Sequence, residues 1–512
     1  MKKDYLIILL ASLFTLLGFL VFTHPFEIPD EQSHFASVNF LVEEGRMPTM
    51  NDPKNLSLEE QTTERIFGIM SEGENKYSYH PEFKVEYTNT RVGKYEQEIK
   101  LLNTPENRST YTIHQSALYP PLYYWFASIF YRLVNQKDII LRLFTTRFAS
   151  LIISSFIPVV AYLIGKVIYQ KEKLAKTLAM LTLFFPMSTY LGVGINSDNL
   201  HNLLFSLAIL LSLQLIKQGP SKFLSLWIGI IVGLDLLTKP QAYILFPIFA
   251  TAFFIRWRFN EFKQWFKLLP YLILPILFIA GWQEIPKFFT SNPYIAKVSP
   301  FGTINDFKTY SLSFIHTLSK EMIVWYWGVF KWFGVIMPRF SWWLANRILG
   351  LAVIGIVVKL YKDIKAKKIT YISKVIIFSI LANLIYLLAL FWFDWQFYQE
   401  YGRSLGIQPR YYLPLLTTQM FLLLTGLLEL GWTQKIKNII TLGLVIFFLG
   451  LHITSLYTQI SSYYDLWPLT TLFTQMSQYK PFFAKGAWWY LWVPLYFTGI
   501  TSFTKWTITT KK

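Results

Sequence analysis

The stretch "MKKDYLIILLASLFTLLGFLVFTHP" (residues 1–25) decides the fold class, because two lysines precede one long apolar run. This run is longer than the roughly 7–15 apolar residues of a secretory signal peptide, and no A-x-A cleavage site follows it. We therefore interpret residues 4–22 as an uncleaved first transmembrane helix. Lys2 and Lys3 predict that the N-terminus lies in the cytoplasm.

The composition extends this interpretation to the whole chain. Of 512 residues, 53% are hydrophobic, 18% are aromatic and only 15% are charged, with a mean hydropathy of +0.35. An average soluble domain carries about 25% charged residues. The sequence therefore predicts an all-α, polytopic (multi-pass) protein of the cell membrane, with the lipid bilayer as its first partner.

The net charge of +18 does not by itself indicate a nucleic-acid partner. Such a partner requires the basic residues to form one patch or groove. Here they lie in short clusters between apolar runs, as orientation in a membrane requires, so we expect no nucleic acid. The absence of cysteine excludes disulfides and thiolate metal sites.

Apolar runs of membrane-spanning length predict about twelve transmembrane helices. We place them at 4–22, 146–169, 174–191, 199–216, 223–238, 241–256, 266–283, 341–361, 372–393, 411–430, 437–455 and 486–505. With the N-terminus inside, nearly every short basic connection falls on the cytoplasmic side, as the positive-inside rule requires. The C-terminus then lies in the cytoplasm as well.

The long connections fall on the outer side. We expect the first helix at 1–22, an extracytoplasmic loop domain at 23–145, helices 2–7 at 146–283, an outer loop at 284–340, and helices 8–12 at 341–512 with outer loops at 394–410 and 456–485. Within the loop domain the pattern predicts a helix at 31–44 and a short hairpin at 76–100. The aromatic segment 118–134 predicts a helix that lies in the membrane interface without crossing it.

The loop domain begins with a dense acidic motif, in which Asp30 and Glu31 are followed by His34. A helix that starts at Asp30 puts Asp30 and His34 on roughly one face. Carboxylates beside a low-dielectric boundary bind protons more tightly unless a cation pairs with them, which suits a general base. The alternative is a helix N-cap beside a solvated surface.

Two further motifs place a charged residue at the outer end of a span. In "GVGINSDNLHN" (192–202), Asp198 lies between two spans, and a helix cap is the alternative to a functional role. In "LLTKPQAYILFP" (236–247), Lys239 precedes a proline. This lysine either reaches lipid head groups or binds a phosphate.

The later outer segments contribute arginine and tryptophan. In "YQEYGRSLGIQPRYYLPLL" (398–416), Arg403 and Arg410 flank a short outer loop, against the positive-inside trend. Guanidinium groups suit phosphate oxygens, and pairing with Glu400 or with lipid head groups is the alternative. The tryptophan-rich segment 324–343, with Lys331 and Arg339, suits either an interfacial belt or stacking on sugar rings.

The ordered set of motifs resembles the GT-C superfamily of membrane glycosyltransferases, which includes the aminoarabinose transferases of lipid A and the protein O-mannosyltransferases. It is also similar to a bacterial family of uncharacterised multi-pass membrane proteins with P-P-D-E-x-x-H-F, F-W-G-x-F-G-W and G-R-Y elements. The matching segments are "PDEQSHFASVNFLVEEG" (29–45), "YPPLYYW" (119–125), "INSDNL" (195–200), "LLTKP" (236–240), "YWGVFKWFG" (326–334) and "QPRYYLPL" (408–415).

The resemblance implies a GT-C glycosyltransferase that moves a sugar from a polyprenyl-phosphate donor to a hydroxyl of a surface glycan, lipid or protein, with inversion. Its catalytic residues would be Asp30, Glu31 and Asp198, with Asp30 as the base. Its substrate-binding residues would be His34, Tyr119, Tyr123, Lys239, Arg403, Arg410 and Tyr411, with Tyr119 in place of the family's histidine. Members differ in their metal dependence and the ligand set here is incomplete, so a divalent metal is not assigned.

Two other functions stay open at this point. An O-antigen polymerase or ligase would share a lipid-linked donor and outer arginines, but its large loop usually comes late in the chain. A non-enzymatic transporter of lipid-linked oligosaccharides predicts charged residues inside spans and internal repeats. Asp235 is the one acid well inside a predicted span, and the sequence contains no evident repeat. No Walker loop or G-x-S-x-G motif is present, which disfavours ATP-driven transport and standard hydrolases.

Overall fold

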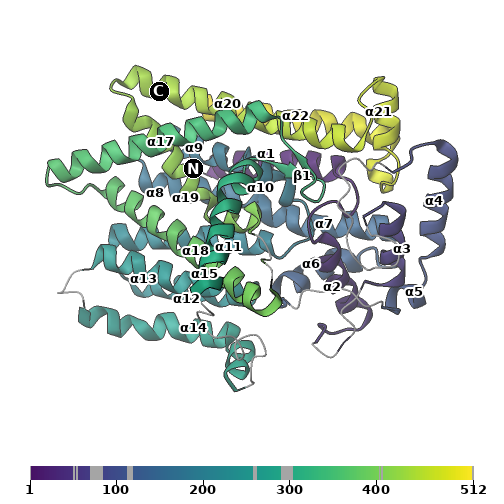
Figure 1. The fold of residues 1–512 in the computed structure, drawn as a ribbon, viewed down its shortest axis with the longest axis horizontal. Coiled ribbons are helices and arrows are strands. Elements are labelled where there is room, and N and C mark those ends of the chain that lie inside the picture. Colours follow the sequence, from purple (N-terminus) through teal and green to yellow (C-terminus); the bar gives the residue numbers. More distant parts are fainter. Residues whose placement is uncertain are drawn as a thin grey trace.

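The computed structural model describes residues 2–49, 52, 56–69, 85–111, 119–257, 262–289, 304–402, 404 and 407–509. In this part of the chain the regular structure is helical, apart from the short antiparallel pair β1 (Val329–Phe330) and β2 (Val335–Ile336). The protein is an all-α polytopic membrane protein, as predicted. Its long helices lie side by side in one bundle (Figure 1).

The N-terminal helices are α1 (Lys2–Phe22), α2 (Glu31–Glu43), α3 (Leu58–Ile66), α4 (Asn89–Leu101), α5 (Pro105–Ser109) and α6 (Leu122–Arg132). The middle helices are α7 (Ile139–Ser155), α8 (Ile157–Ile168), α9 (Glu172–Leu183), α10 (Pro186–Leu191), α11 (Asp198–Gln218), α12 (Lys222–Leu236), η1 (Pro240–Ile244), α13 (Leu245–Arg256) and α14 (Phe262–Phe289). The C-terminal helices are α15 (Ile304–Thr317), η3 (Leu318–Met322), α16 (Ile323–Trp325), α17 (Arg339–Lys365), α18 (Tyr371–Tyr401), η4 (Pro409–Leu415), α19 (Leu416–Leu430), α20 (Gln434–Tyr463), α21 (Leu469–Met476), η5 (Phe482–Ala484), η6 (Gly486–Trp488) and α22 (Trp489–Ile508).

Within the described residues, 8 helical segments are long and apolar enough to cross a membrane. They are Asp4–Phe22, Ile139–Ile168, Asp198–Gln218, Trp265–Pro286, Arg339–Lys365, Tyr371–Tyr401, Pro409–Leu430 and Gln434–Tyr463. Each coincides with a predicted span. The four other predicted spans fall on α9 with α10, on α12, on α13 and on α22. These helices are broken at Pro186, too short or less apolar, so the span number of about twelve stays a prediction.

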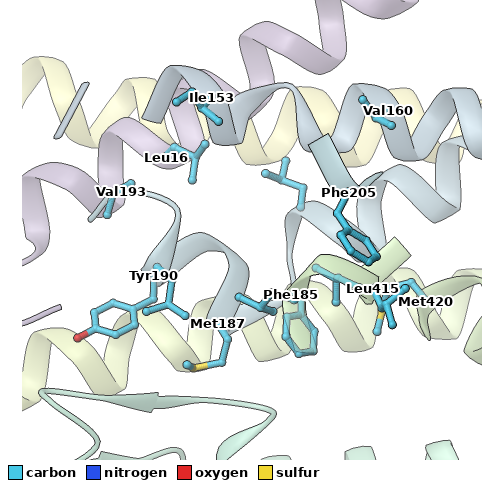
Figure 2. Close-up of a cluster of buried hydrophobic side chains, with 14 of the residues drawn as sticks. Leu16, Ile153, Val160, Phe185, Met187, Tyr190, Val193, Phe205, Leu415 and Met420 are labelled. Atoms are coloured by element: carbon cyan, nitrogen blue, oxygen red, sulfur yellow. The ribbon is translucent and has the colours of Figure 1, made fainter. Parts of the chain in front are cut away.

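The core of the bundle is made by apolar side chains from helices that are distant in sequence. Figure 2 shows Leu16 of α1, Ile153 of α7, Tyr190 of α10, Phe205 of α11 and Met420 of α19 in one cluster. All five are buried. This cluster packs α1, α7, α10, α11 and α19 against one another.

Helices α2 to α6 gather at one end of the bundle, away from both chain termini (Figure 1). Trp125 and Ile129 of α6 and its C-cap residue Leu133 are exposed at four-residue spacing, whereas Tyr124 and Tyr131 are buried. This 11-residue amphipathic helix is too short to cross a membrane, and its position in the interface stays a prediction.

The predicted hairpin at 76–100 is wrong for residues 89–100, which belong to α4. Val92 and Ile99 are seven residues apart and both buried, which is one face of a helix. Residues 76–84 lie outside the described part of the chain. The predicted helix at 31–44 corresponds to α2.

Candidate active site

The acidic motif lies in the turn between α1 and α2. Asp30 occupies the N-cap position of α2, but its side chain caps no helical N–H group. Its backbone is left-handed (φ 62°), a conformation that aspartate tolerates better than most residues. Asp30 therefore occupies the predicted N-cap position, but its carboxylate caps no N–H group and is directed to another partner.

That partner is Arg410, at the start of η4, 380 residues further along the chain. The Asp30 carboxylate forms an ion pair with the Arg410 guanidinium, which also donates to the Pro29 carbonyl oxygen at 3.2 Å. The Asp30 side chain is 42% exposed, whereas the Arg410 side chain is 5% exposed. The pair thus combines a buried cation with a carboxylate that a substrate can reach. Arg410 therefore pairs with Asp30 and not with Glu400, which was the alternative from the sequence.

The electrostatic surroundings keep Asp30 ionised. Desolvation alone would raise the pKa of this carboxyl, but Arg410, and to a lesser extent His34 and Lys239, lower it below its ordinary value of 3.8. Asp30 is therefore a carboxylate at neutral pH. Any event that draws Arg410 away from Asp30 would raise the proton affinity of this group.

The Glu31 carboxylate, in contrast to that of Asp30, is fully buried. The Glu31 side chain and that of Arg147 on α7 are both 0% exposed, and Arg147 donates to the two carboxylate oxygens of Glu31 at 2.7 and 2.6 Å. The Ile195 N–H donates to the same carboxylate at 3.2 Å. Arg147 also donates to the carbonyl of His24 at 2.9 Å. Glu31 therefore ties α2 to α7 and to the segment before α11, with no surface left for a substrate.

A second ion pair joins Asp198, the first residue of α11, to Lys239 at the junction of α12 and η1. Asp198 does not cap α11 with its side chain; instead its own N–H donates to the Asn196 side chain at 2.8 Å. The Lys239 side chain is 6% exposed, which excludes the interpretation that it reaches out to lipid head groups. The Lys239 ammonium lies 5.5 Å from the centroid of Tyr119 and 5.9 Å from that of Tyr411.

These two tyrosines join the two ion pairs into one site. The Arg410 guanidinium lies 5.2 Å from the centroid of the Tyr411 ring, on which Lys239 also lies. Tyr119 stacks on His34 with centroids 5.4 Å apart and an interplanar angle of 13°. Five chain segments thus meet here: the α1–α2 turn, the segment before α6, the start of α11, the α12–η1 junction and the start of η4.

His34 is neutral in this site. Burial lowers the pKa of the His34 imidazole to about 3, and Lys239 and Arg410 act in the same direction. Asp30 opposes this effect but does not outweigh it. Its Nδ1 forms a 2.7 Å hydrogen bond with the hydroxyl of Tyr124, a residue that the sequence did not single out. His34 can therefore orient a substrate by hydrogen bonding but supplies no charge to a phosphate.

Besides Glu31, two predicted residues are not placed in the site. Tyr123 is fully buried, and its hydroxyl pairs with the Ser150 hydroxyl at 2.7 Å and accepts from the Asn196 N–H at 3.0 Å. This tyrosine holds the segment before α11 in place. Arg403 lies outside the described residues. No cluster of three or more His, Cys, Asp or Glu that could hold a metal ion occurs in the described part of the chain.

The tryptophan-rich segment is hydrogen-bonded to the turn between α1 and α2, called the acidic turn below, which carries Asp30. Lys331, Trp332 and Phe333 are three consecutive residues with left-handed backbone (φ 50°, 53° and 65°). The Trp332 indole donates to the Phe26 carbonyl at 3.0 Å, and its backbone N–H donates to the Glu27 carbonyl at 3.3 Å. Trp332 is thus bound to the Asp30 turn, which is not the arrangement of a residue in an interfacial belt.

Lys480 was also not singled out by the sequence. Its buried ammonium donates to the Val21 carbonyl at 2.9 Å and to the Thr23 carbonyl at 2.5 Å, at the C-terminal end of α1. A cation at this position satisfies carbonyl groups that lack helical partners. The 456–485 segment thereby fixes the exit of α1 into the acidic turn.

Comparisons with known proteins give one family. The family described as "predicted membrane protein (DUF2142)" matches residues 13–419. No curated protein matches the chain. Among solved structures, the chain is similar to ArnT from Cupriavidus metallidurans bound to undecaprenyl phosphate, with 12% identity and a TM-score of 0.43 over 99% of this chain and 77% of that one. It is also similar to the archaeal oligosaccharyltransferase AglB from Archaeoglobus fulgidus, in complex with an inhibitory peptide and a dolichol-phosphate. There the identity is 13% and the TM-score 0.42, over 90% of this chain and 56% of that one.

The family match covers the C-terminal half of α1, the acidic turn and both ion pairs of the site. It confirms the resemblance to a family of multi-pass membrane proteins. The chain belongs to the DUF2142 family of membrane proteins.

Proposed function

We propose that this protein is a GT-C membrane glycosyltransferase, which moves a sugar from a polyprenyl-phosphate donor to an acceptor hydroxyl with inversion. The observation that carries the proposal is the contact between a half-exposed carboxylate, Asp30, and a buried cation, Arg410, beside the second pair of Asp198 and Lys239. One site then holds a base for the acceptor and two cations for a phosphate. The ordered sequence motifs of the GT-C superfamily supply these same four residues.

An apolar groove beside the site suits the hydrocarbon chain of such a donor. A cavity of about 600 Å³ begins at Tyr412, next to Tyr411, and follows α19 past Met420 to Leu423. Its other walls come mainly from α17 and α18, including Ile356 and Leu387. A polyprenyl chain in this groove would place its phosphate near Arg410. The lipid form of the donor thereby accounts for a site at the ends of membrane-spanning helices.

The chemistry follows from the exchange of partners at Arg410. When the donor phosphate binds Arg410 and Lys239, it offsets the positive charge that lowers the pKa of Asp30. Asp30 then accepts the proton of the acceptor hydroxyl as the acceptor oxygen bonds to the anomeric carbon. The bond between that carbon and the phosphate oxygen breaks, and polyprenyl phosphate leaves with its charge stabilised by the two cations. Asp30 acts as a strong base only after the donor has bound.

The other residues have supporting roles in this scheme. His34, held by Tyr124, and Tyr119 line the acceptor side, and Asp198 holds Lys239 in place through their ion pair. Glu31 positions the turn through Arg147. We also place the site on the outer face and both termini in the cytoplasm, in line with the distribution of basic connections.

The transporter alternative has less support. Asp235, the acid inside a predicted span, is 0% exposed and its carboxylate forms a 2.8 Å hydrogen bond with His201. A transporter requires such groups to face a passage. The polymerase or ligase alternative shares the donor chemistry and differs in the acceptor.

A complementation experiment tests the proposed activity. Surface glycans and lipids of a strain that lacks the protein are compared, by mass spectrometry, with those of strains that carry wild type, Asp30→Asn or Glu106→Gln. Glu106 is an exposed carboxylate on α5, remote from both ion pairs, and serves as the matched control. We expect wild type and Glu106→Gln to restore a sugar modification that Asp30→Asn, at equal protein level, does not. Restoration by Asp30→Asn would remove the assigned base.

A further inference from the structure

A cavity lined by several basic side chains lies at the opposite end of the helix bundle from Asp30 and Arg410. It has a volume of about 510 Å³ and lies where α8 and α19 end and α9, α18 and α20 begin. Arg410 and Leu428 are separated by most of α19, which corresponds to roughly 25 Å along a helix. We call this space the basic cavity; it is lined by Lys171, Lys173, Lys437, Gln434, Asn438 and Glu429, among others.

The basic cavity carries more positive than negative charge. Three lysines line it against a single acid, Glu429. Lys171 donates to the Gln434 side chain at 2.8 Å, and Gln434 donates to the Asn438 side chain at 3.2 Å. Among the described residues no carboxylate forms an ion pair with Lys173 or Lys437. Two ammonium groups and a polar amide chain are therefore available to an anion.

The neighbouring space is suited to hydrocarbon. An adjoining cavity of about 480 Å³ shares Lys173, Asn438 and Thr441 with the basic cavity. Its remaining wall includes Ile439 and Leu442 of α20 and Ile508 of α22, which are 60%, 42% and 44% exposed. A ligand that fills both spaces needs a negatively charged head and an apolar tail, side by side.

We propose that these two cavities bind one anionic phospholipid of the membrane leaflet that faces them. Its phosphodiester lies among Lys171, Lys173 and Lys437, and its acyl chains follow Ile439 and Leu442. Basic pockets between transmembrane helices bind anionic lipid head groups in this way. The apolar cavity favours a lipid over free phosphate, which would fill the polar space alone. This site is separate from the proposed glycosyl transfer and does not depend on it.

Native mass spectrometry of the purified, delipidated protein tests the assignment. We expect wild type to retain one molecule of added phosphatidylglycerol and to bind phosphatidylcholine much more weakly. The Lys173→Gln/Lys437→Gln double variant should bind phosphatidylglycerol about 10-fold to 30-fold more weakly, because it loses two charge contacts. The charge-matched control Lys222→Gln/Lys365→Gln removes two exposed lysines that line neither cavity, and should bind like wild type.

A charge-conserving variant and a competition with inorganic phosphate complete the test. The Lys173→Arg/Lys437→Arg variant keeps both charges and should retain the lipid, which separates loss of charge from loss of folding. Equal binding of phosphatidylglycerol and phosphatidylcholine, or unchanged binding by the Gln double variant, overturns the proposal. Displacement of the lipid by millimolar inorganic phosphate overturns the assignment of a lipid ligand.

Discussion

Asp30 and Glu31 are adjacent acids with different roles in the structure. Asp30 is half-exposed and contacts Arg410, whereas Glu31 is buried against Arg147. Neighbouring residues at a helix start point about 100° apart, so one side chain faces the site and the other faces α7. The sequence indicated the motif and Asp30 as the base, but the register of α2 against α7 decides which acid is accessible.

The two acids predict different effects on stability. Glu31→Gln leaves the Arg147 charge buried without its partner, and should lower the free energy of unfolding by about 3–5 kcal/mol. Asp30→Asn also leaves a buried guanidinium without its carboxylate, but the Asp30 side chain is 42% exposed and water can take its place, so the loss should be smaller, about 1–2 kcal/mol. Thermal unfolding of the purified variants measures both. A smaller loss for Glu31→Gln than for Asp30→Asn would contradict the structural role of Glu31.

Stability should also depend on pH through Asp30. Because its pKa lies below the ordinary value of 3.8, the ionised group stabilises the folded state above about pH 4, and this contribution is lost as the pH falls through the lower, folded pKa. The difference in unfolding temperature between wild type and Asp30→Asn should therefore be constant from about pH 7 to pH 5 and shrink below about pH 4. In an Arg410→Gln background that difference should be smaller or reversed at neutral pH. A difference that grows on acidification is inconsistent with the Asp30–Arg410 pair.

Several site residues could not be found from the sequence alone. Arg147 lies within helix α7, where neither a motif nor spacing singles it out, and Tyr124 lies in the "YPPLYYW" motif but was not selected from it. Tyr123 was chosen over its neighbour Tyr124, but the register of α6 directs Tyr124 to His34 and Tyr123 to Ser150. The two ion pairs of the site were found because charged residues next to apolar runs are conspicuous.

At the scale of elements, the apolar runs predicted the long helices well, because the bilayer fixes their length and composition. Which helices pack against one another depends on the shapes of their surfaces, and this could not be predicted from the sequence. Helices α17 and α19 cross in backbone contact, since a Cβ atom on Gly355 would collide with the carbonyl oxygen of Gly426. Small residues permit this approach between membrane helices.

This crossing gives a matched pair of substitutions in α17. Gly355→Ala should lower stability by about 1–3 kcal/mol, because the added methyl group forces the two helices apart. A methyl group added at Gly350 would meet no atom within 4 Å, so Gly350→Ala should be neutral or should stabilise the helix by up to about 1 kcal/mol. Thermal unfolding of both variants checks the difference. Equal effects at the two positions would show that α17 and α19 do not approach as described.

At the scale of the whole molecule, the fold brings Asp30 and Arg410 together at one end of the bundle, although they are 380 residues apart in sequence. The lysines of the basic cavity lie at the other end. Charge asymmetry of this kind orients membrane proteins. The sequence predicts an orientation from the basic clusters, with these connections in the cytoplasm. It could not supply the meeting of five segments at Asp30 and Arg410, which depends on packing between distant helices.

The orientation can be tested cleanly because the chain contains no cysteine. Single variants Ser109→Cys, on α5, and Lys365→Cys, at the end of α17, each introduce one exposed thiol at opposite ends of the bundle. In intact cells a membrane-impermeant maleimide should label Ser109→Cys alone, and after lysis it should label both. Labelling of Lys365→Cys in intact cells would reverse the proposed orientation.

In the proposed mechanism, Arg410 exchanges the Asp30 carboxylate for the phosphate of the donor lipid. The most direct measurement is the affinity of the purified protein for polyprenyl phosphate, compared between wild type, Asp30→Asn and Arg410→Gln. We predict that Asp30→Asn binds at least as tightly as wild type, because the competing carboxylate is gone. Arg410→Gln should bind about 10-fold to 100-fold more weakly, since it loses a charge-assisted contact worth roughly 1.5–3 kcal/mol. Wild-type affinity in Arg410→Gln, or a large loss in Asp30→Asn, would contradict the exchange.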